Sequence, residues 1–222
     1  MNALGADVTS IRPRSLPPTD ATLDDELAAL GTRAGEFLPV DMRAALDIQA
    51  RIRETPLDNQ TKGIFLEQMA RAARSAGVPC EQRYVAFRDY PLRDFMRLLA
   101  DYAPARHAHV SVREAFRRVG SEAFTTLMNS VPGRVLYVLA RGDVHSALRL
   151  APEAYKRNLS HCTVNLSVDA PRQVVLEFRG VWNFAECYHV GVVEGACRAF
   201  GVDPRVRIRV HSACDVDLLV RW

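Results

Sequence analysis

The C-terminal stretch "RVRIRVHSACDVDLLVRW", residues 205–222, alternates apolar and polar residues along most of its length. Val206, Ile208 and Val210 share one face of its first half, and arginines occupy the other face. A two-residue period is typical of a strand with one buried face, and the central "HSACD" indicates a turn. We therefore expect a β-hairpin whose last side chain, Trp222, points inward and holds the chain end by its burial.

A second alternating pair precedes this hairpin. The segments "HCTVNLSV" (161–168) and "RQVVLEF" (172–178) are joined by the turn "DAPR", which predicts another hairpin. Between the hairpins, "FAECYHVGVVEGACRAFG" (184–201) has helical spacing and ends on a glycine. A sheet with one apolar face must be covered by helices. We predict an α+β fold, in which the helical N-terminal two-thirds pack on a small antiparallel sheet built from two β-hairpins flanking a helix (residues 161–222).

The upstream two-thirds of the chain show helical patterns separated by proline and glycine. We expect helices over residues 22–31, 40–54, 58–77, 90–103, 111–130 and 144–159. Pro104 is expected to end one of them, Gly120 to kink another, and Pro152 to break the last. Residues 83–87 suggest a short extended piece. The apolar run over 135–139 fits either a buried strand or a helical turn by its pattern alone.

The composition of the chain limits the classes of protein to which it can belong. The 222 residues carry a net charge of only +3, which gives no argument for a nucleic-acid partner. No run of 18 apolar residues occurs, so we expect no membrane span. Residues 1–20 lack periodicity and are expected to form a flexible leader before a single α+β domain over 21–222. An odd number of cysteines, 5, favours a reducing compartment, and we expect a cytoplasmic protein.

The C-terminal region resembles a known ligand-binding superfamily. The features that carry the likeness are the glycine-containing helix "YHVGVVEGACRAFG" between two hairpins and the closing "DVDLLVRW". Haem nitric-oxide sensors, four-vinyl-reductase domains of phenol-sensing regulators and Bet3-type subunits of the TRAPP tethering complex share such a domain. In these families a G-x-x-x-G helix precedes the final hairpin, and Gly191 and Gly195 match it here.

The whole chain is more similar still to a paralogous family of unknown function, largely from myxobacteria. The likeness covers about residues 25–222 and rests on the order of its motifs. These are "TPLDNQTKGIFLEQM", "YPLRDFMRLLADYA", "REAFRRVG", "PGRVLYVL", "LRLAPEAYKRNL", the glycine helix and the final tryptophan. The resemblance implies that residues 134–140 are helical.

Two glycines within one helix predict a close contact. A glycine in a helix interior costs about 1 kcal/mol relative to alanine, so Gly191 and Gly195 should admit another backbone. Either a ligand or a second subunit contacts this stripe, or the helix packs tightly on its own sheet. We favour the packing interpretation.

Catalytic and metal-binding patterns are absent from the sequence. It contains no G-x-S-x-G, H-E-x-x-H or phosphate-binding glycine motif, and we predict that the protein is not an enzyme. Glu186, His189 and Glu194 are expected to be solvated helix residues. No C-x-x-C pair supports the loose zinc spacing of Cys187 with His189 or of His211 with Cys214. The Tyr-x-Ser-x-Arg motif of the haem sensors is also missing, and we expect neither metal nor cofactor.

A pocket, if the fold leaves one, is expected between the helical stripe and the apolar face of the sheet. Its candidate lining residues are Phe95, Leu99, Tyr102, Phe116, Leu166, Leu176, Phe178 and Ile208. Our first functional hypothesis is a non-enzymatic regulatory or sensor domain that binds a small apolar molecule there. The alternative is a homodimeric scaffold that binds a protein partner, in the manner of the TRAPP Bet3-like proteins. The third hypothesis is a haem or metal sensor.

Overall fold

The alternating C-terminal segments form the two expected hairpins of one antiparallel sheet. The first hairpin joins β4 (Thr163–Ala170) to β5 (Gln173–Arg179), and the second joins β6 (Arg205–Val210) to β7 (Val216–Arg221). The hairpins pair through β5 and β7. A two-residue strand that the sequence did not predict, β1 (Leu38–Pro39), extends the edge at β6, giving the order β1-β6-β7-β5-β4.

The computed structural model describes residues 36–128, 135, 137–140 and 142–222. The expected leader and the helix expected over 22–31 lie outside these residues. The division into a leader and one domain therefore stays a prediction.

Most described residues upstream of the sheet are helical. The helices are α2 (Ile48–Glu54), α3 (Gly63–Ser75), α4 (Leu92–Arg106), α5 (Val112–Met128), α7 (Val144–Arg149) and α8 (Ala151–Asn158). Residues 135 and 137–139 are helical too, as the family resemblance implied. A small second sheet pairs β2 (Gln60–Lys62) with β3 (Asp89–Pro91).

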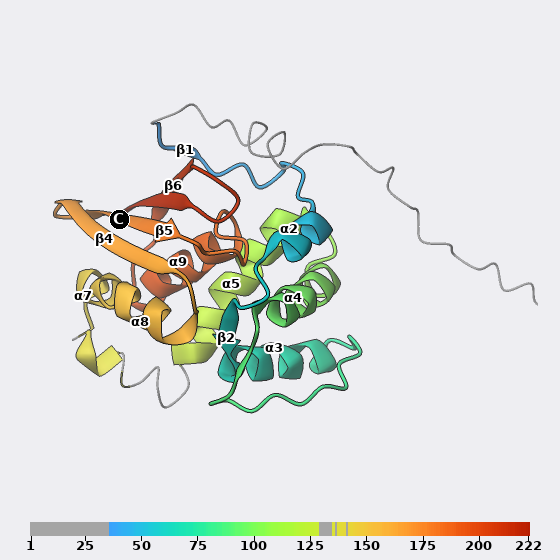
Figure 1. Ribbon diagram of the computed structural model, residues 1–222. Coiled ribbons are helices and arrows are strands. Elements are labelled where there is room, and N and C mark those ends of the chain that lie inside the picture. The colour runs from blue at the N-terminus through green and yellow to red at the C-terminus, as the bar shows by residue number, and fades with distance from the viewer. Residues whose placement is uncertain (1–35, 129–134, 136, 141) are drawn as a thin grey trace, which may run out of the picture.

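The glycine helix α9 (Tyr188–Ala199) lies at the centre of the molecule, between the sheet and α5 (Figure 1). Helices α2, α3 and α4 pack beyond α5, while α7 and α8 lie beside the sheet near β4. The predicted α+β class, with helices covering a small antiparallel sheet, is confirmed.

Two apolar cores meet at α9. The helical core is formed by α3, α4 and α5 around Leu66, Leu99 and Phe116. The sheet core is formed by the inner faces of β5, β6 and β7 against α9, and includes Leu176 and Leu218. Each buried side chain of this size contributes about 1.5–3 kcal/mol, so both cores fix the position of α9.

Several local expectations were wrong, and the helix expected over 58–77 begins only at Gly63, after β2. Residues 40–47 are not helical, because α2 begins only after Asp47, whose Oδ1 accepts a hydrogen bond from the backbone N–H of Ala50 at 2.8 Å. Residues 83–87 form no strand. Helix α4 continues past Pro104 to Arg106, since a proline so near the helix end forfeits only one backbone hydrogen bond. The site of the expected kink, Gly120, lies within a continuous α5.

The side chain at the chain end is less buried than expected. Trp222 packs against the sheet core and its ring lies 6.3 Å from that of His145, but the side chain is only partly buried. Its backbone N–H donates to the carbonyl oxygen of Arg172 at 3.2 Å. Backbone pairing as well as burial therefore holds the terminus.

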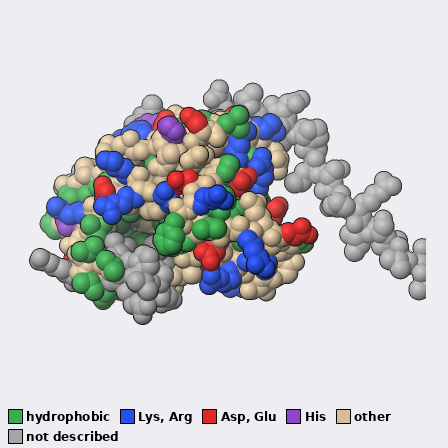
Figure 2. All heavy atoms as spheres, turned by 60° about the horizontal axis from the view of Figure 1, so that its bottom comes forward, with side chains coloured by type: hydrophobic (Ala, Val, Ile, Leu, Met, Phe, Trp, Pro, Cys, Tyr) green, Lys and Arg blue, Asp and Glu red, His purple; other side chains and the backbone are tan. Residues whose placement is uncertain are grey.

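Within the described ranges, no helix has both the length and the apolar character that crossing a bilayer requires. On the face of the molecule in Figure 2, basic and acidic side chains are interspersed.

Candidate functional site

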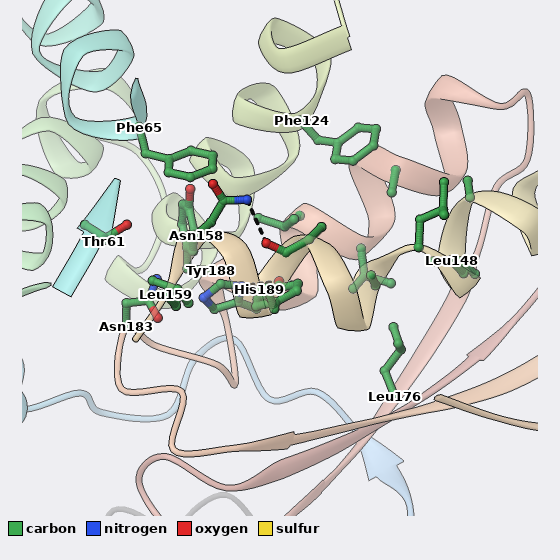
Figure 3. A pocket seen from close by; sticks show the side chains of 18 of the residues that line it. Thr61, Phe65, Phe124, Leu148, Asn158, Leu159, Leu176, Asn183, Tyr188 and His189 are labelled. Atoms are coloured by element: carbon green, nitrogen blue, oxygen red, sulfur yellow. Dashed lines mark hydrogen bonds between the residues drawn. The ribbon is translucent and has the colours of Figure 1, made fainter. Parts of the chain in front are cut away.

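A pocket of about 160 Å³ lies where α9, α7, α8 and the sheet meet the helical core. Figure 3 shows Phe65 and Phe124 on one side of it and Leu176 of the sheet on the opposite side. The lining residues are Thr61, Phe65, Phe95, Phe124, Ala147, Leu148, Leu150, Ala151, Ala154, Tyr155, Asn158, Leu159, Leu176, Asn183, Tyr188, His189, Val192, Val193 and Ala196.

Small side chains create the space. Ala147, Ala151 and Ala154 face the pocket from α7 and α8, and Ala196 faces it from α9. The pocket is partly open to solvent, and Ala154 is the lining residue most exposed at the surface, which marks the side where we place the opening. Figure 2 shows hydrophobic side chains bordering a recess on the face that carries this region. None of the described lining residues is Lys, Arg, Asp or Glu, and the pocket therefore favours an uncharged occupant.

The polar groups gather at one end. The Tyr155 hydroxyl lies 2.5 Å from Nδ1 of His189. Asn183 and His189 lie toward the same end of the pocket in Figure 3. Among the described residues, nothing hydrogen-bonds to His189 Nε2 or to Asn183 Oδ1, although both side chains are buried, with 4% and 3% of their surface exposed. A buried polar atom without a partner costs about 1–3 kcal/mol, so this end of the pocket is incomplete by itself.

Burial fixes the protonation state of this end. Loss of hydration lowers the pKa of His189 to about 3, against a weaker opposing effect of Glu186. Burial also raises the pKa of Tyr155 well above its ordinary value. The imidazole is therefore neutral and the phenol protonated. Among the described residues the Tyr155 hydroxyl has no hydrogen-bond acceptor other than His189 Nδ1, and we assign the hydroxyl as the donor because the reverse direction would leave the buried phenol proton unpaired. The ring proton of His189 is then on Nε2.

Two of the eight residues proposed from the sequence line this pocket, Phe95 and Leu176. The others do not. The side chains of Leu99, Tyr102 and Phe116 belong to the helical core, those of Phe178 and Ile208 to the sheet core, and that of Leu166 packs half-buried against the sheet core.

The expectation that Glu186, His189 and Glu194 are solvated was wrong, because all three are buried. A sequence signal for His189 existed. Val192, Val193 and Ala196 follow it at helical spacings of three, four and seven, which places the histidine on an apolar face. No comparable pattern marks Asn183 or Tyr155 as lining residues.

Glu186 is the centre of a buried ion-pair network just before α9. Its carboxylate lies 3.1 Å from Nη2 of Arg51 and 3.0 Å from Nη1 of Arg113. Burial opposes ionisation, but the two guanidinium groups outweigh it and lower the pKa of Glu186. Arg51 also donates to the carbonyl of Ala213 at 2.6 Å, and Arg113 to that of Ala45 at 2.7 Å. The network ties α2, α5 and the β6–β7 turn to the start of α9.

The glycine stripe of α9 contacts α5. A Cβ added to Gly191 would lie 1.8 Å from the carbonyl oxygen of Arg117, and one added to Gly195 would lie 2.6 Å from that of Ser121. A Cβ added to Gly120 of α5 would lie 2.1 Å from the carbonyl oxygen of Tyr188. The close contact is therefore with another helix of the same chain. The expectation that this stripe packs tightly on the sheet was wrong.

Two of the cysteines have protonated thiols, which are poor metal ligands. Burial raises the pKa of Cys162 to about 11 and that of Cys197 to about 12, which keeps both thiols protonated. In the part of the chain that the structure describes, no three His, Cys, Asp or Glu side chains are placed to hold a metal ion.

Several solved H-NOX domains share this arrangement of elements. One is the Fe(II) unliganded H-NOX protein from K. algicida, at 13% identity and a TM-score of 0.53, with 72% of this chain and 95% of that one covered. Another is a variant of the T. tengcongensis H-NOX protein, at 14% identity and a TM-score of 0.53, with 72% and 96% covered. A study of haem distortion in the H-NOX family supplies a third, at 13% and 0.55, with 72% and 94% covered. At this identity the likeness shows a shared fold.

The pocket does not fit haem. Its 160 Å³ falls below the range of about 300–1,000 Å³ typical of sites for drug-sized ligands, and a porphyrin is at least that large. Its described lining also offers no lysine or arginine to pair with the two propionates.

No curated protein sequence matches the chain. A family model described as "Protein of unknown function (DUF2378)" matches residues 60–222, which include every element from β2 to β7. That match spans well over half of the sequence, and the chain belongs to this family of proteins of unknown function.

Proposed function

We propose that this protein is a regulatory or sensor domain that binds a small, largely apolar molecule in the pocket between α9, α8 and the sheet. The observation that carries the proposal is an apolar, partly open pocket at the junction of the two cores. The H-NOX-like fold supports it, because the fold is one in which other proteins hold a small-molecule ligand. A cytoplasmic location is part of the proposal.

The pocket volume sets the size of the ligand. An apolar cavity of about 150 Å³ can take up benzene or xenon, and the pocket here is close to that size. We expect one ring or a short branched chain, with further atoms extending toward the opening at Ala154.

The chemistry of the lining favours binding over catalysis. A general base works best when its pKa is near the working pH, and the pKa of His189 is about 3. The thiols nearest to α9, those of Cys187 and Cys197, have raised pKa values because they are buried. No described group at the pocket is thus prepared to act as a base or a nucleophile at neutral pH.

The test is a titration with toluene, in which binding is measured by methyl NMR spectra or by calorimetry. Toluene should bind the natural protein, and the variant Ala196→Leu, which fills the pocket, should not bind it. Ala154→Phe, placed at the opening, provides a second plug that does not disturb the interior. The matched control is Ala105→Leu on the exposed side of α4, which should bind toluene normally. Equal binding by all four proteins would refute the proposal.

A dimeric interaction module is the second candidate. Four apolar residues near the end of the helical region are exposed, namely Val135, Tyr137, Val138 and Leu139. The glycine stripe of α9 offers no subunit contact, because α5 covers it. Sedimentation velocity decides between the states. A monomer at every concentration would eliminate this candidate, and a dimer that Val138→Asp dissociates would support it.

A further inference from the structure

We propose that the ligand carries one neutral group that both accepts and donates a hydrogen bond, a hydroxyl or a carboxamide, and that this group binds His189 and Asn183. The inference rests on the proposed function and adds the chemical class of the ligand. It comes from the two buried side chains at the polar end of the pocket that lack partners among the described residues.

The two unpaired atoms need opposite hydrogen-bonding partners, one an acceptor and the other a donor. His189 Nε2 carries the ring proton, since Nδ1 accepts from Tyr155 at 2.5 Å, and it therefore needs an acceptor. Asn183 Oδ1 needs a donor. A ketone or an ether could serve only His189, and an N–H group whose lone pair is delocalised, such as that of pyrrole, could serve only Asn183. A hydroxyl or a primary carboxamide offers both functions from one small group.

Charged ligands are excluded by the surroundings. A carboxylate or an ammonium group would lose its hydration in the pocket, and no described lining residue carries a compensating charge. The closest ion pairs are already engaged, because Glu186 is bound by both Arg51 and Arg113. The neutral state of the ligand follows from this environment.

The position of the polar end also sets the shape of the ligand. Away from His189 and Asn183, the walls are mainly aliphatic or aromatic, with Phe124, Leu148 and Leu176 at a distance from them in Figure 3. A ligand that fits is apolar over most of its surface and has its hydrogen-bonding group at one end. Benzyl alcohol and benzamide have this form, and toluene is the same shape without the polar group.

The experiment measures selectivity. Dissociation constants for benzyl alcohol, benzamide, toluene and benzoate are determined by calorimetry at pH 7 for the natural protein and for Asn183→Leu and His189→Phe. We expect the preference for benzyl alcohol or benzamide over toluene to fall about tenfold in each variant, the value of one net hydrogen bond. Toluene should bind all three proteins, which shows that they fold. Benzoate should bind none of them.

A spectroscopic readout locates the contact. The ¹⁵N resonance of His189 Nε2 should shift when benzyl alcohol binds and stay unchanged with toluene. Selectivity that is identical in the natural protein and both variants would overturn the inference while leaving the proposed function standing. Failure of every probe, toluene included, would overturn both.

Discussion

Small residues on the two sides of α9 have opposite effects on the packing. On the side of α5, Gly191 and Gly195 let a neighbouring backbone approach until no space is left. On the side of α7 and α8, Ala196 faces other alanines, and a pocket of about 160 Å³ persists. A glycine stripe opposite a continuous helix closes a seam, whereas alanines opposite two short helices leave a hollow. The closed side provides rigidity and the open side provides the site.

The two sides of α9 also differ in whether their polar groups are charged. The closed side carries ion pairs, with Glu186 between Arg51 and Arg113 and with Glu194 on Arg117 at 2.7 Å. The open side carries neutral polar groups, His189 and Asn183. Stability should therefore depend mainly on the closed side of α9, and ligand binding on the open side.

The largest loss of stability is expected from Glu186→Gln. Removing one partner from a buried ion pair costs about 3–5 kcal/mol, and here two guanidinium groups would lose their anion. Urea unfolding measures the difference. The control is Glu67→Gln on α3, whose ion pair with Arg71 is exposed and should matter by less than about 0.5 kcal/mol. Similar losses in both variants would contradict the assigned role.

The same network predicts a dependence on pH. Because the pKa of Glu186 is lowered in the folded protein, its contribution to stability is complete above the unfolded value of about 4.3 and is lost as the pH falls further. The free energy of unfolding of Glu186→Gln should therefore decline less steeply below about pH 4 than that of the natural protein.

The next largest loss of stability is expected at the close contact between α9 and α5. In Gly191→Ala the new methyl group would lie 1.8 Å from a backbone oxygen of α5, so the helices must separate, at a cost of about 3 kcal/mol. Gly195→Ala, at 2.6 Å from the nearest backbone atom, should cost less. Thermal unfolding ranks the two. A gain in stability of about 1 kcal/mol, as intrinsic helix propensity alone would give, would show that α9 and α5 are not in close contact at these glycines.

The open side should respond in the reverse way. Ala196→Leu places apolar atoms in an existing hollow, so the free energy of unfolding should change by less than about 1 kcal/mol while toluene binding is lost. A large destabilisation would mean that this side of α9 is as tightly packed as the other.

A small effect that appears only as the pH falls is expected from His189. Its pKa is about 3 in the folded protein and about 6.5 when unfolded, so the unfolded chain takes up the proton first as the pH falls. Between pH 7 and 5.5 the natural protein should lose about 1 kcal/mol that His189→Phe retains. Parallel stability curves for the two proteins over this range would show that the histidine is not buried in its neutral form.

The hairpins and α9 could be predicted from sequence because their periodicity is local. The alternation of Val206 and Ile208 reports the face of a strand whatever lies opposite. The family resemblance supplied what periodicity could not, such as the helical state of residues 137–139. The short β1 has too few residues to show a period, and it exists only because β6 offers an edge.

The pocket could be predicted in its general place but not in its lining. Large apolar residues such as Phe116 and Phe178 look alike in the sequence whether they fill a core or border a space. The space instead results from alanines on three helices, and their convergence is a property of the packing. Burial of Glu186 likewise depends on two arginines that lie far from it in the sequence.

The most direct test of the open side of α9 is a crystal structure of this protein determined under xenon pressure. Xenon enters apolar cavities of about this size and scatters strongly. We expect xenon density between Ala196, Ala154 and Leu176 in the natural protein, and none there in the variant Ala196→Leu. Side chains filling that space, with no xenon bound there in the natural protein, would contradict this expectation.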